Sequence, residues 1–118
     1  MRPSLLAAGL TAALAACSDP LLPRDEWVRA RPTGDAALSI TNRGDAPVYI
    51  QVADPTEFVL LSGCTPSTCT RIAPGGTVRV PFSQITAYDP GDAQAAVVWW
   101  LFQDDGSPVA TGTVVVAL

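Results

Sequence analysis

Hydrophobic and polar residues alternate with a period of two along most of the chain that follows the apolar N-terminal run. Such alternation is typical of β-strands that bury one face, and no segment beyond that run has a sustained helical period. Short strands separated by turns with glycine and proline predict an all-β fold, an antiparallel β-sandwich of six or seven strands. The segments that we expect to form strands are 27–31, 36–42, 48–52, 58–61, 77–82, 95–103 and 109–118.

Two of the turns have the composition of β-hairpin loops. Residues 42–45, Asn-Arg-Gly-Asp, predict a hairpin between the strands at 36–42 and 48–52, with Gly44 able to take a positive φ. Residues 104–107, Asp-Asp-Gly-Ser, predict a second hairpin that joins the last two strands. We therefore expect the two strands of each hairpin to be antiparallel neighbours in the same sheet.

The first 16 residues have the features of a cleaved targeting peptide. Arg2 supplies a positive charge, and a 12-residue apolar core follows over residues 5–16. This run is too short to span a bilayer, which takes about 20 apolar residues. We therefore expect a helical signal peptide over residues 1–16, removed from the mature protein.

The sequence Leu14-Ala15-Ala16-Cys17 resembles the lipobox of bacterial lipoproteins at all four positions. The resemblance implies cleavage before Cys17, a diacylglycerol thioether on its sulfur, and attachment to a membrane through that lipid. An ordinary secretory peptide with an incidental cysteine is the alternative. Two prolines in residues 17–26 predict an extended tether. Because Ser18 and not aspartate follows the cysteine, the resemblance favours the outer membrane, on the side that faces the periplasm.

The segment Ile40-Thr41-Asn42-x-Gly44-x-x-x-Val48 resembles the first hairpin of many bacterial Ig-like extracytoplasmic domains. The resemblance implies an Ig-like β-sandwich over residues 27–118. The chain departs from antibody-type Ig domains, because it has no cysteine pair that could bridge the sheets with a tryptophan between them.

Size and charge limit the classes of function. Removal of 16 residues from 118 leaves 102, which is enough for one small domain. The mature chain has six arginines and eleven carboxylates, a net charge near −5. Nucleic-acid binding usually needs a basic face. From this balance we expect no basic face and no nucleic-acid partner.

The remaining cysteines predict a disulfide. With Cys17 assigned to the lipid, Cys64 and Cys69 form an even pair in an oxidising compartment. The Thr-Pro-Ser-Thr between them lets the chain double back, so we expect a bond that contributes about 2 kcal/mol on the entropic model. A metal site would need further histidine or cysteine ligands, and a redox motif would have two intervening residues. We expect no metal and no cofactor.

The chain contains no histidine and no lysine. Histidine-based triads, typical catalytic zinc sites and Schiff-base chemistry are therefore excluded. Two carboxylates across a cleft could hydrolyse glycosides, but Asp104 and Asp105 are neighbours in a turn, where side chains diverge. We therefore expect a binding protein and not an enzyme. Oxygen ligands at 54–57 and 89–92 leave calcium binding open, although the same residues are usual in turns.

The last hairpin is apolar on both faces. The two rows of its first strand are Val97, Trp99 and Leu101 on one side and Val98, Trp100 and Phe102 on the other. A sandwich buries only one face of each sheet, so the second row needs a cover. Either the segment with Leu21, Leu22 and Trp27 or the loop at 85–88 folds over it, or the row binds a protein partner.

These patterns together indicate a function. We expect a membrane-anchored lipoprotein that is a structural or protein-binding accessory module of the bacterial envelope. Its partner-binding residues would be Val98, Trp100 and Phe102, and its partner an envelope protein. The alternative is binding of a small ligand or calcium by the loops at one end of the sandwich.

Overall fold

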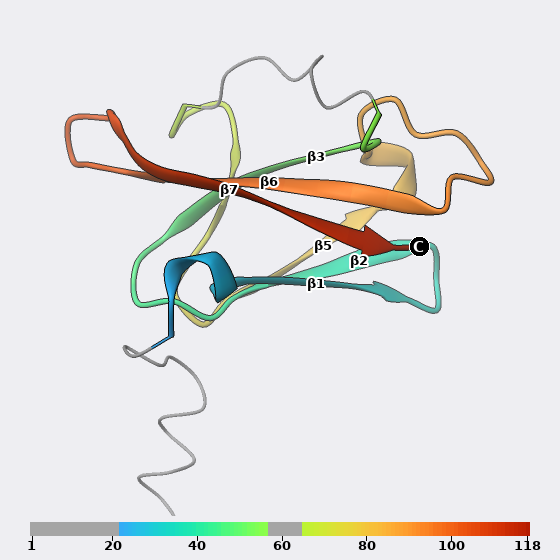
Figure 1. Cartoon of the computed structure of the whole chain (residues 1–118), viewed down its shortest axis with the longest axis horizontal. Helices are drawn as coiled ribbons and strands as arrows, with labels where there is room; N and C mark the ends of the chain where they lie inside the picture. The colour runs from blue at the N-terminus through green and yellow to red at the C-terminus, as the bar shows by residue number, and fades with distance from the viewer. Residues whose placement is uncertain (1–21, 57–64) are drawn as a thin grey trace, which may run out of the picture.

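The computed structural model describes residues 22–56 and 65–118, which form two β-sheets stacked face to face (Figure 1). The elements are η1 (Arg24–Glu26), β1 (Val28–Thr33), β2 (Ala37–Asn42), β3 (Val48–Ala53), β4 (Thr70–Ile72), β5 (Thr77–Pro81), η3 (Phe82–Gln84), β6 (Gln94–Phe102) and β7 (Pro108–Ala117). The signal helix predicted at 1–16, Cys17, and the strand predicted at 58–61 lie outside the described residues.

The strands divide into a smaller and a larger sheet, both antiparallel. The smaller sheet has the order β1-β2-β5, and the larger has the order β4-β3-β6-β7. Figure 1 shows them as two layers, with the β6–β7 hairpin opposite β1 and β2. The predicted all-β sandwich is confirmed at this level. So is the strand expected near 27–31, because β1 lies at a sheet edge beside β2.

The hairpin predicted at residues 42–45 is wrong. The strands on either side of it, β2 and β3, belong to different sheets, so the chain crosses between the layers there. Turn-forming residues indicate that the chain reverses direction, but they do not indicate whether the flanking strands share a sheet. In this crossing loop Gly44 does not have the positive φ that we expected.

The hairpin predicted at residues 104–107 is confirmed, because β6 and β7 pair along their whole length. Gly106 has a φ of 84°, and its N–H donates to the Gln103 carbonyl at 2.9 Å. The hydroxyl and the N–H of Ser107 donate to Asp105 Oδ1 at 2.6 and 2.9 Å. These two bonds hold the pKa of the Asp105 carboxyl below its ordinary value.

Asn42 fixes the crossing between the sheets. Its side chain is fully buried, and its Nδ2 donates to the carbonyls of Ala46 at 2.8 Å and Ile72 at 3.0 Å. Its Oδ1 accepts the N–H of Gly44 at 2.9 Å. Because Ile72 belongs to β4, this amide links the end of β2 to the opposite sheet. The bonds also satisfy the polar atoms that Asn42 brings into the core.

Two tryptophans in the core between the sheets each lie against a glycine. A Cβ atom on Gly44 would overlap the ring of Trp27, and a Cβ atom on Gly112 would overlap the ring of Trp99. Gly112 is the cross-strand partner of Trp99, so the indole lies over the backbone of β7. The lack of a side chain at these two positions makes room for the largest residues of the core.

Candidate interaction surface

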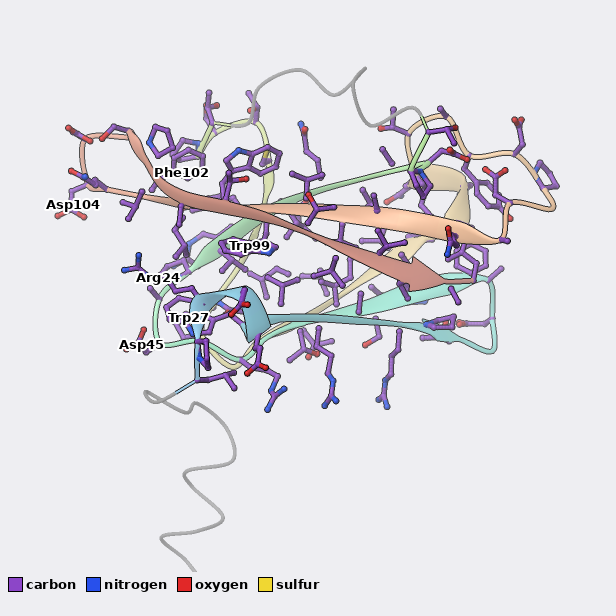
Figure 2. All side chains as sticks on the ribbon, in the orientation of Figure 1. Arg24, Trp27, Asp45, Trp99, Phe102 and Asp104 are labelled. Carbon is purple, nitrogen blue, oxygen red and sulfur yellow. The ribbon has the colours of Figure 1, made fainter. Side chains whose placement is uncertain are left out.

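The outer row of β6 lies on the side of the larger sheet that faces away from the smaller sheet. Trp99 is 3% exposed and belongs to the core, whereas its neighbour Trp100 is partly exposed. Figure 2 shows Trp99 directed between the sheets and Phe102 directed away from them. Phe102 is also partly exposed, while Val98 is only 9% exposed. The three residues predicted to bind a partner thus share one face, with Val98 as its buried end.

Cross-strand neighbours extend this row into a broader surface. We call aromatic face the set Tyr49, Gln51, Val98, Trp100, Phe102, Thr111 and Thr113, which are in register across β3, β6 and β7. The rings of Tyr49 and Phe102 meet nearly edge to face, with centroids 5.3 Å apart. Such a contact is worth about 0.5–1.5 kcal/mol beyond the area it buries, so it holds both rings in place.

The aromatic face is nearly free of charge. No residue of β3, β6 or β7 is charged, and Arg71 is the one charged residue of β4. On the edge strand β7, Val109 and Val115 are 44% and 55% exposed. Interface cores are depleted of charged residues and enriched in aromatic ones. The composition of this surface is therefore that of a protein interface.

Neither segment that we expected to cover the aromatic face does so in the described residues. Trp27 and Ile85 belong to the core cluster between the sheets, and Leu22 and Tyr88 pack against that cluster. These two segments instead fill the space between the sheets at the ends and edges of the sandwich, because a protein core is close-packed. Leu21 lies outside the described residues.

Gln51 has a polar atom without a partner on the aromatic face. Its Oε1 is buried, and no hydrogen bond reaches it within the described part of the chain. A buried acceptor in this state costs about 1–3 kcal/mol relative to a paired one. Gln51 is in register with Val98, so its side chain lies among the residues predicted to bind a partner. A hydrogen-bond donor from that partner would remove this cost.

A hollow of about 410 Å³ adjoins the aromatic face at one end of the sandwich. Its walls include Trp27, Tyr49 and Phe102, and the charged residues Arg24, Asp45 and Asp104 also line it (Figure 2). Small-molecule sites are concave and mostly apolar, with a few convergent polar groups. This hollow is therefore where a small ligand would bind, if the alternative function were correct.

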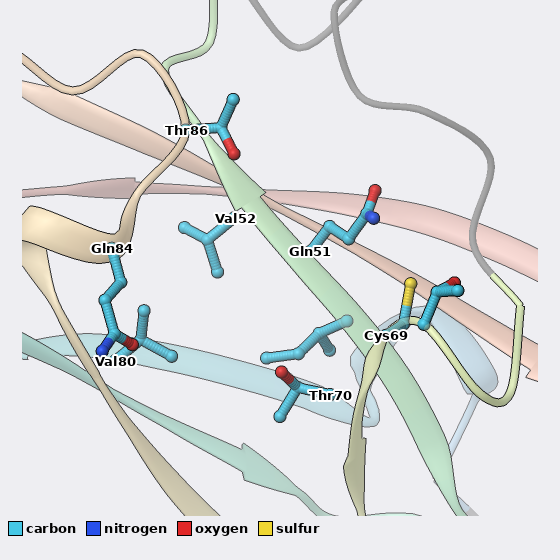
Figure 3. Close-up of a pocket in the computed structure, with 9 residues that line it drawn as sticks. Gln51, Val52, Cys69, Thr70, Val80, Gln84 and Thr86 are labelled. Carbon is cyan, nitrogen blue, oxygen red and sulfur yellow. The ribbon is translucent and has the colours of Figure 1, made fainter.

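A second hollow, of about 200 Å³, opens between the sheets at the edge where β4 is short (Figure 3). Its lining is Ile50, Gln51, Val52, Thr68, Cys69, Thr70, Val80, Gln84 and Thr86. None of these side chains is charged. We therefore assign no binding role to this opening.

The cysteines of the predicted disulfide lie on either side of the boundary of the described residues. Cys69 directly precedes β4, and Cys64 lies outside the described part. The N–H groups of Thr68 and Cys69 both donate to the Thr65 carbonyl, at 3.1 and 3.2 Å. The turn expected between the cysteines is therefore present over residues 65–69, and the Cys64–Cys69 bond stays a prediction.

One carboxylate in each of the two candidate calcium loops accepts hydrogen bonds within or near its own turn. Asp54 Oδ1 accepts bonds from the hydroxyl and the N–H of Thr56, at 2.6 and 2.8 Å. These bonds, with a smaller contribution from Asp92, hold the pKa of Asp54 below its ordinary value. Asp92 in turn accepts the N–H of Asp89 at 2.9 Å. Among the described residues, no three metal-ligating side chains come close enough together to hold a metal ion.

The expectation that the charge balance leaves no basic face is wrong. Arginines project from the outer side of the smaller sheet, at Arg29, Arg31 and Arg79, and Arg43 follows β2 directly. Net charge is a sum over the whole chain, and it says nothing about how charges of each sign are distributed. The absence of a nucleic-acid partner stays a prediction.

The described residues contain no helix with the length and apolar character needed to cross a membrane. Comparisons of the chain with models of protein families, with curated proteins and with solved structures found no match. The chain is therefore characterised by its own sequence and geometry.

Proposed function

We propose that this protein is a lipoprotein of the bacterial envelope that binds a protein partner through the aromatic face. The observation that carries the proposal is the outer surface of the larger sheet, where Trp100 and Phe102 are partly exposed and Arg71, beside Tyr49, is the one charged residue of its described strands. Aromatic residues at the centre of an interface often contribute 2 kcal/mol or more each to binding, which is about thirtyfold in affinity. A few such anchors are enough for a specific complex.

The order of the strands supports an Ig-like sandwich. In the constant-type Ig fold the first, second, fourth and fifth strands form one sheet, and the third, sixth and seventh form the other. Among the strands of the described residues, the first, second and fifth form the smaller sheet, and β4 lies beside β3 in the larger one. Sandwiches of this class vary in such details while they keep the two-layer architecture.

The absence of histidine and lysine supports binding over catalysis. Most general acid–base and nucleophilic mechanisms near neutral pH use one of these residues or a metal that they help to hold. The described carboxylates of Asp54 and Asp105 instead accept hydrogen bonds from neighbouring turn residues.

The anchor in this proposal is the lipid on Cys17, in the outer membrane on the side that faces the periplasm. Two or three acyl chains hold a protein on a bilayer almost permanently, since each buried methylene contributes about 0.8 kcal/mol. We expect Cys17→Ser to release the protein into the soluble fraction or to stall its processing. Membrane retention like that of the wild type would contradict the anchor.

Site-specific photo-crosslinking in the native envelope tests the partner. A crosslinking residue at Thr113, exposed and in register with Val98, should give a discrete protein adduct. The matched control is Thr41, an outward-facing threonine of the smaller sheet, which should give none. Equal adducts at both positions, or an adduct at Thr41 alone, would refute the assignment of the partner to the aromatic face.

The predicted disulfide can be tested separately. Without reductant, a thiol reagent should label neither Cys64 nor Cys69 in the intact mature protein. Labelling of both would show that the bond is absent.

A second candidate function is binding of a small ligand in the hollow beside Phe102. It is favoured by the volume of about 410 Å³ and by the mixture of aromatic and charged residues in the lining. In this case Asp104→Asn would weaken ligand binding, detected as loss of ligand-induced thermal stabilisation, and would leave the Thr113 adduct unchanged.

A further inference from the structure

The smaller sheet has an outer face whose chemistry is opposite to that of the aromatic face. None of the residues of β1, β2 and β5 is acidic. We call arginine face the set Arg29, Arg31, Ser39, Thr41, Arg43, Thr77 and Arg79. Cross-strand register places Arg29 beside Thr41 and Arg31 beside Ser39, so each arginine of β1 has a small hydroxyl residue next to it.

The arginines of this face are largely free of acidic partners. Arg79 pairs with Asp35 of the β1–β2 turn, with 2.9 Å between Nη2 and Oδ2. Among the described residues, Arg29, Arg31 and Arg43 form no ion pair. These three arginines line a depression of about 590 Å³ together with Ser39 and Thr41. Figure 2 shows nitrogen-tipped side chains that project from this sheet, away from the larger one.

The start of the described chain is fastened close to this face. The carbonyl of Leu22 accepts a bond from Trp27 Nε1 at 3.0 Å, and the Trp27 carbonyl accepts the N–H of Arg43 at 2.7 Å. In Figure 1 the described residues begin at one end of the smaller sheet, next to η1. Leu22 is five positions after Cys17, a span of at most about 18 Å when fully extended. A lipid on Cys17 would therefore hold this end of the sandwich, where Arg43 lies, near the bilayer surface.

We propose that the arginine face binds the phosphates of anionic phospholipid headgroups, so that the smaller sheet rests on the membrane and the aromatic face points away from it. The proposal rests on the lipid anchor of the proposed function, which supplies the nearness of the membrane. The arginine face supplies the orientation.

The chemistry of the face suits a layer of phosphates. Guanidinium groups bind phosphate oxygens with two parallel hydrogen bonds, and the hydroxyls of Ser39 and Thr41 are further donors. The small side chains between the arginines leave the guanidinium groups accessible from outside. Attraction to an anionic bilayer extends over about 8 Å at physiological salt, so it acts only once the anchor has brought the domain close.

Binding to vesicles tests the arginine face without the lipid. The mature chain with Cys17→Ser, exported behind an ordinary secretory signal, is mixed with vesicles of phosphatidylcholine alone or with phosphatidylglycerol added. We expect salt-sensitive co-sedimentation with the anionic vesicles only. Each arginine removed should weaken it about fivefold, so Arg29→Gln with Arg31→Gln should weaken it roughly 25-fold.

Arg71→Gln is the matched control, because Arg71 is exposed but lies on the larger sheet. It should leave binding unchanged, and thermal unfolding should show that all variants fold. Equal binding to neutral vesicles, equal loss in Arg71→Gln, or no binding to anionic vesicles would each overturn the proposal. If there were no binding to anionic vesicles, an acidic protein or a nucleic acid would become the expected partner of the arginine face.

The outcome of the vesicle test can be distinguished from the outcome of the anchor test. If Cys17→Ser leaves the protein in native membranes, the lipid anchor is wrong, whatever the vesicles show. If Cys17→Ser releases the protein but vesicle binding does not depend on the arginines, the anchor stands and the arginine face does not bind headgroups.

Discussion

Trp99 and Trp100 are adjacent in sequence, yet the structure places them in different environments. Trp99 lies in the core against Gly112, whereas Trp100 lies partly exposed on the outer face of the same sheet. Both belong to apolar rows, and hydrophobicity alone does not distinguish the rows. The difference arises because only one side of β6 faces another sheet. We infer that the inner row stabilises the fold and that the outer row binds a partner.

The largest effect on stability is expected when the inner tryptophan, Trp99, is removed. Trp99→Ala removes a buried indole and leaves a cavity between the sheets, so we expect the free energy of unfolding to fall by about 4 kcal/mol. Urea unfolding measures it. If Trp99→Ala were as stable as the wild type, the inner row would not be the core.

A smaller loss is expected when the space for that ring is filled. Gly112→Ala places a methyl group where the indole of Trp99 lies, and overpacking of this kind costs about 2 kcal/mol. Gly34→Ala is the matched control, because nothing lies within 4 Å of its added methyl group. Equal losses in the two variants would mean that the cost is a property of glycine replacement and not of the tryptophan contact.

The outer row should contribute less to stability. Phe102→Leu removes the edge-to-face contact with Tyr49, and we expect unfolding to become easier by about 1 kcal/mol. The same substitution in a Tyr49→Leu background should cost less, because the ring partner is already absent. A loss equal to that of Trp99→Ala would erase the distinction between the two rows.

The smallest effect on stability is expected at Trp100, where the readout is fluorescence. Trp27 and Trp99 are buried, so acrylamide should quench mainly Trp100. Trp100→Phe should lower the quenching constant toward that of buried indoles while unfolding changes by about 0.5 kcal/mol or less. Unchanged quenching in this variant would show that Trp100 is not the accessible tryptophan.

The strands could be predicted from the sequence because alternation is local. The elements expected at 36–42, 77–82 and 95–103 are present with nearly the same boundaries. The pairing of β2 with β5 could not be predicted, since it depends on contacts far apart in the chain. Asn42 and Gly44 have the composition of a turn, and their roles as a link between sheets and as space for Trp27 become clear only in three dimensions.

The arginine face could have been found in the sequence but was missed. Arg29 and Arg31 alternate with Ala30 along a strand, and Arg79 lies between two valines in another. This pattern places the arginines on the side opposite to the apolar residues. The net negative charge concealed it, because the carboxylates lie mostly in turns and not in these strands.

The central claim, that the outer row of β6 binds a partner and is not needed for folding, is tested most directly by one variant measured in two ways. Trp100→Thr is introduced into the chain that carries the crosslinking residue at Thr113, and both the free energy of unfolding and the yield of the envelope adduct are determined. We predict a stability within about 1 kcal/mol of the parent and an adduct reduced at least tenfold. A stability loss as large as that of Trp99→Ala, or an undiminished adduct, would contradict the claim.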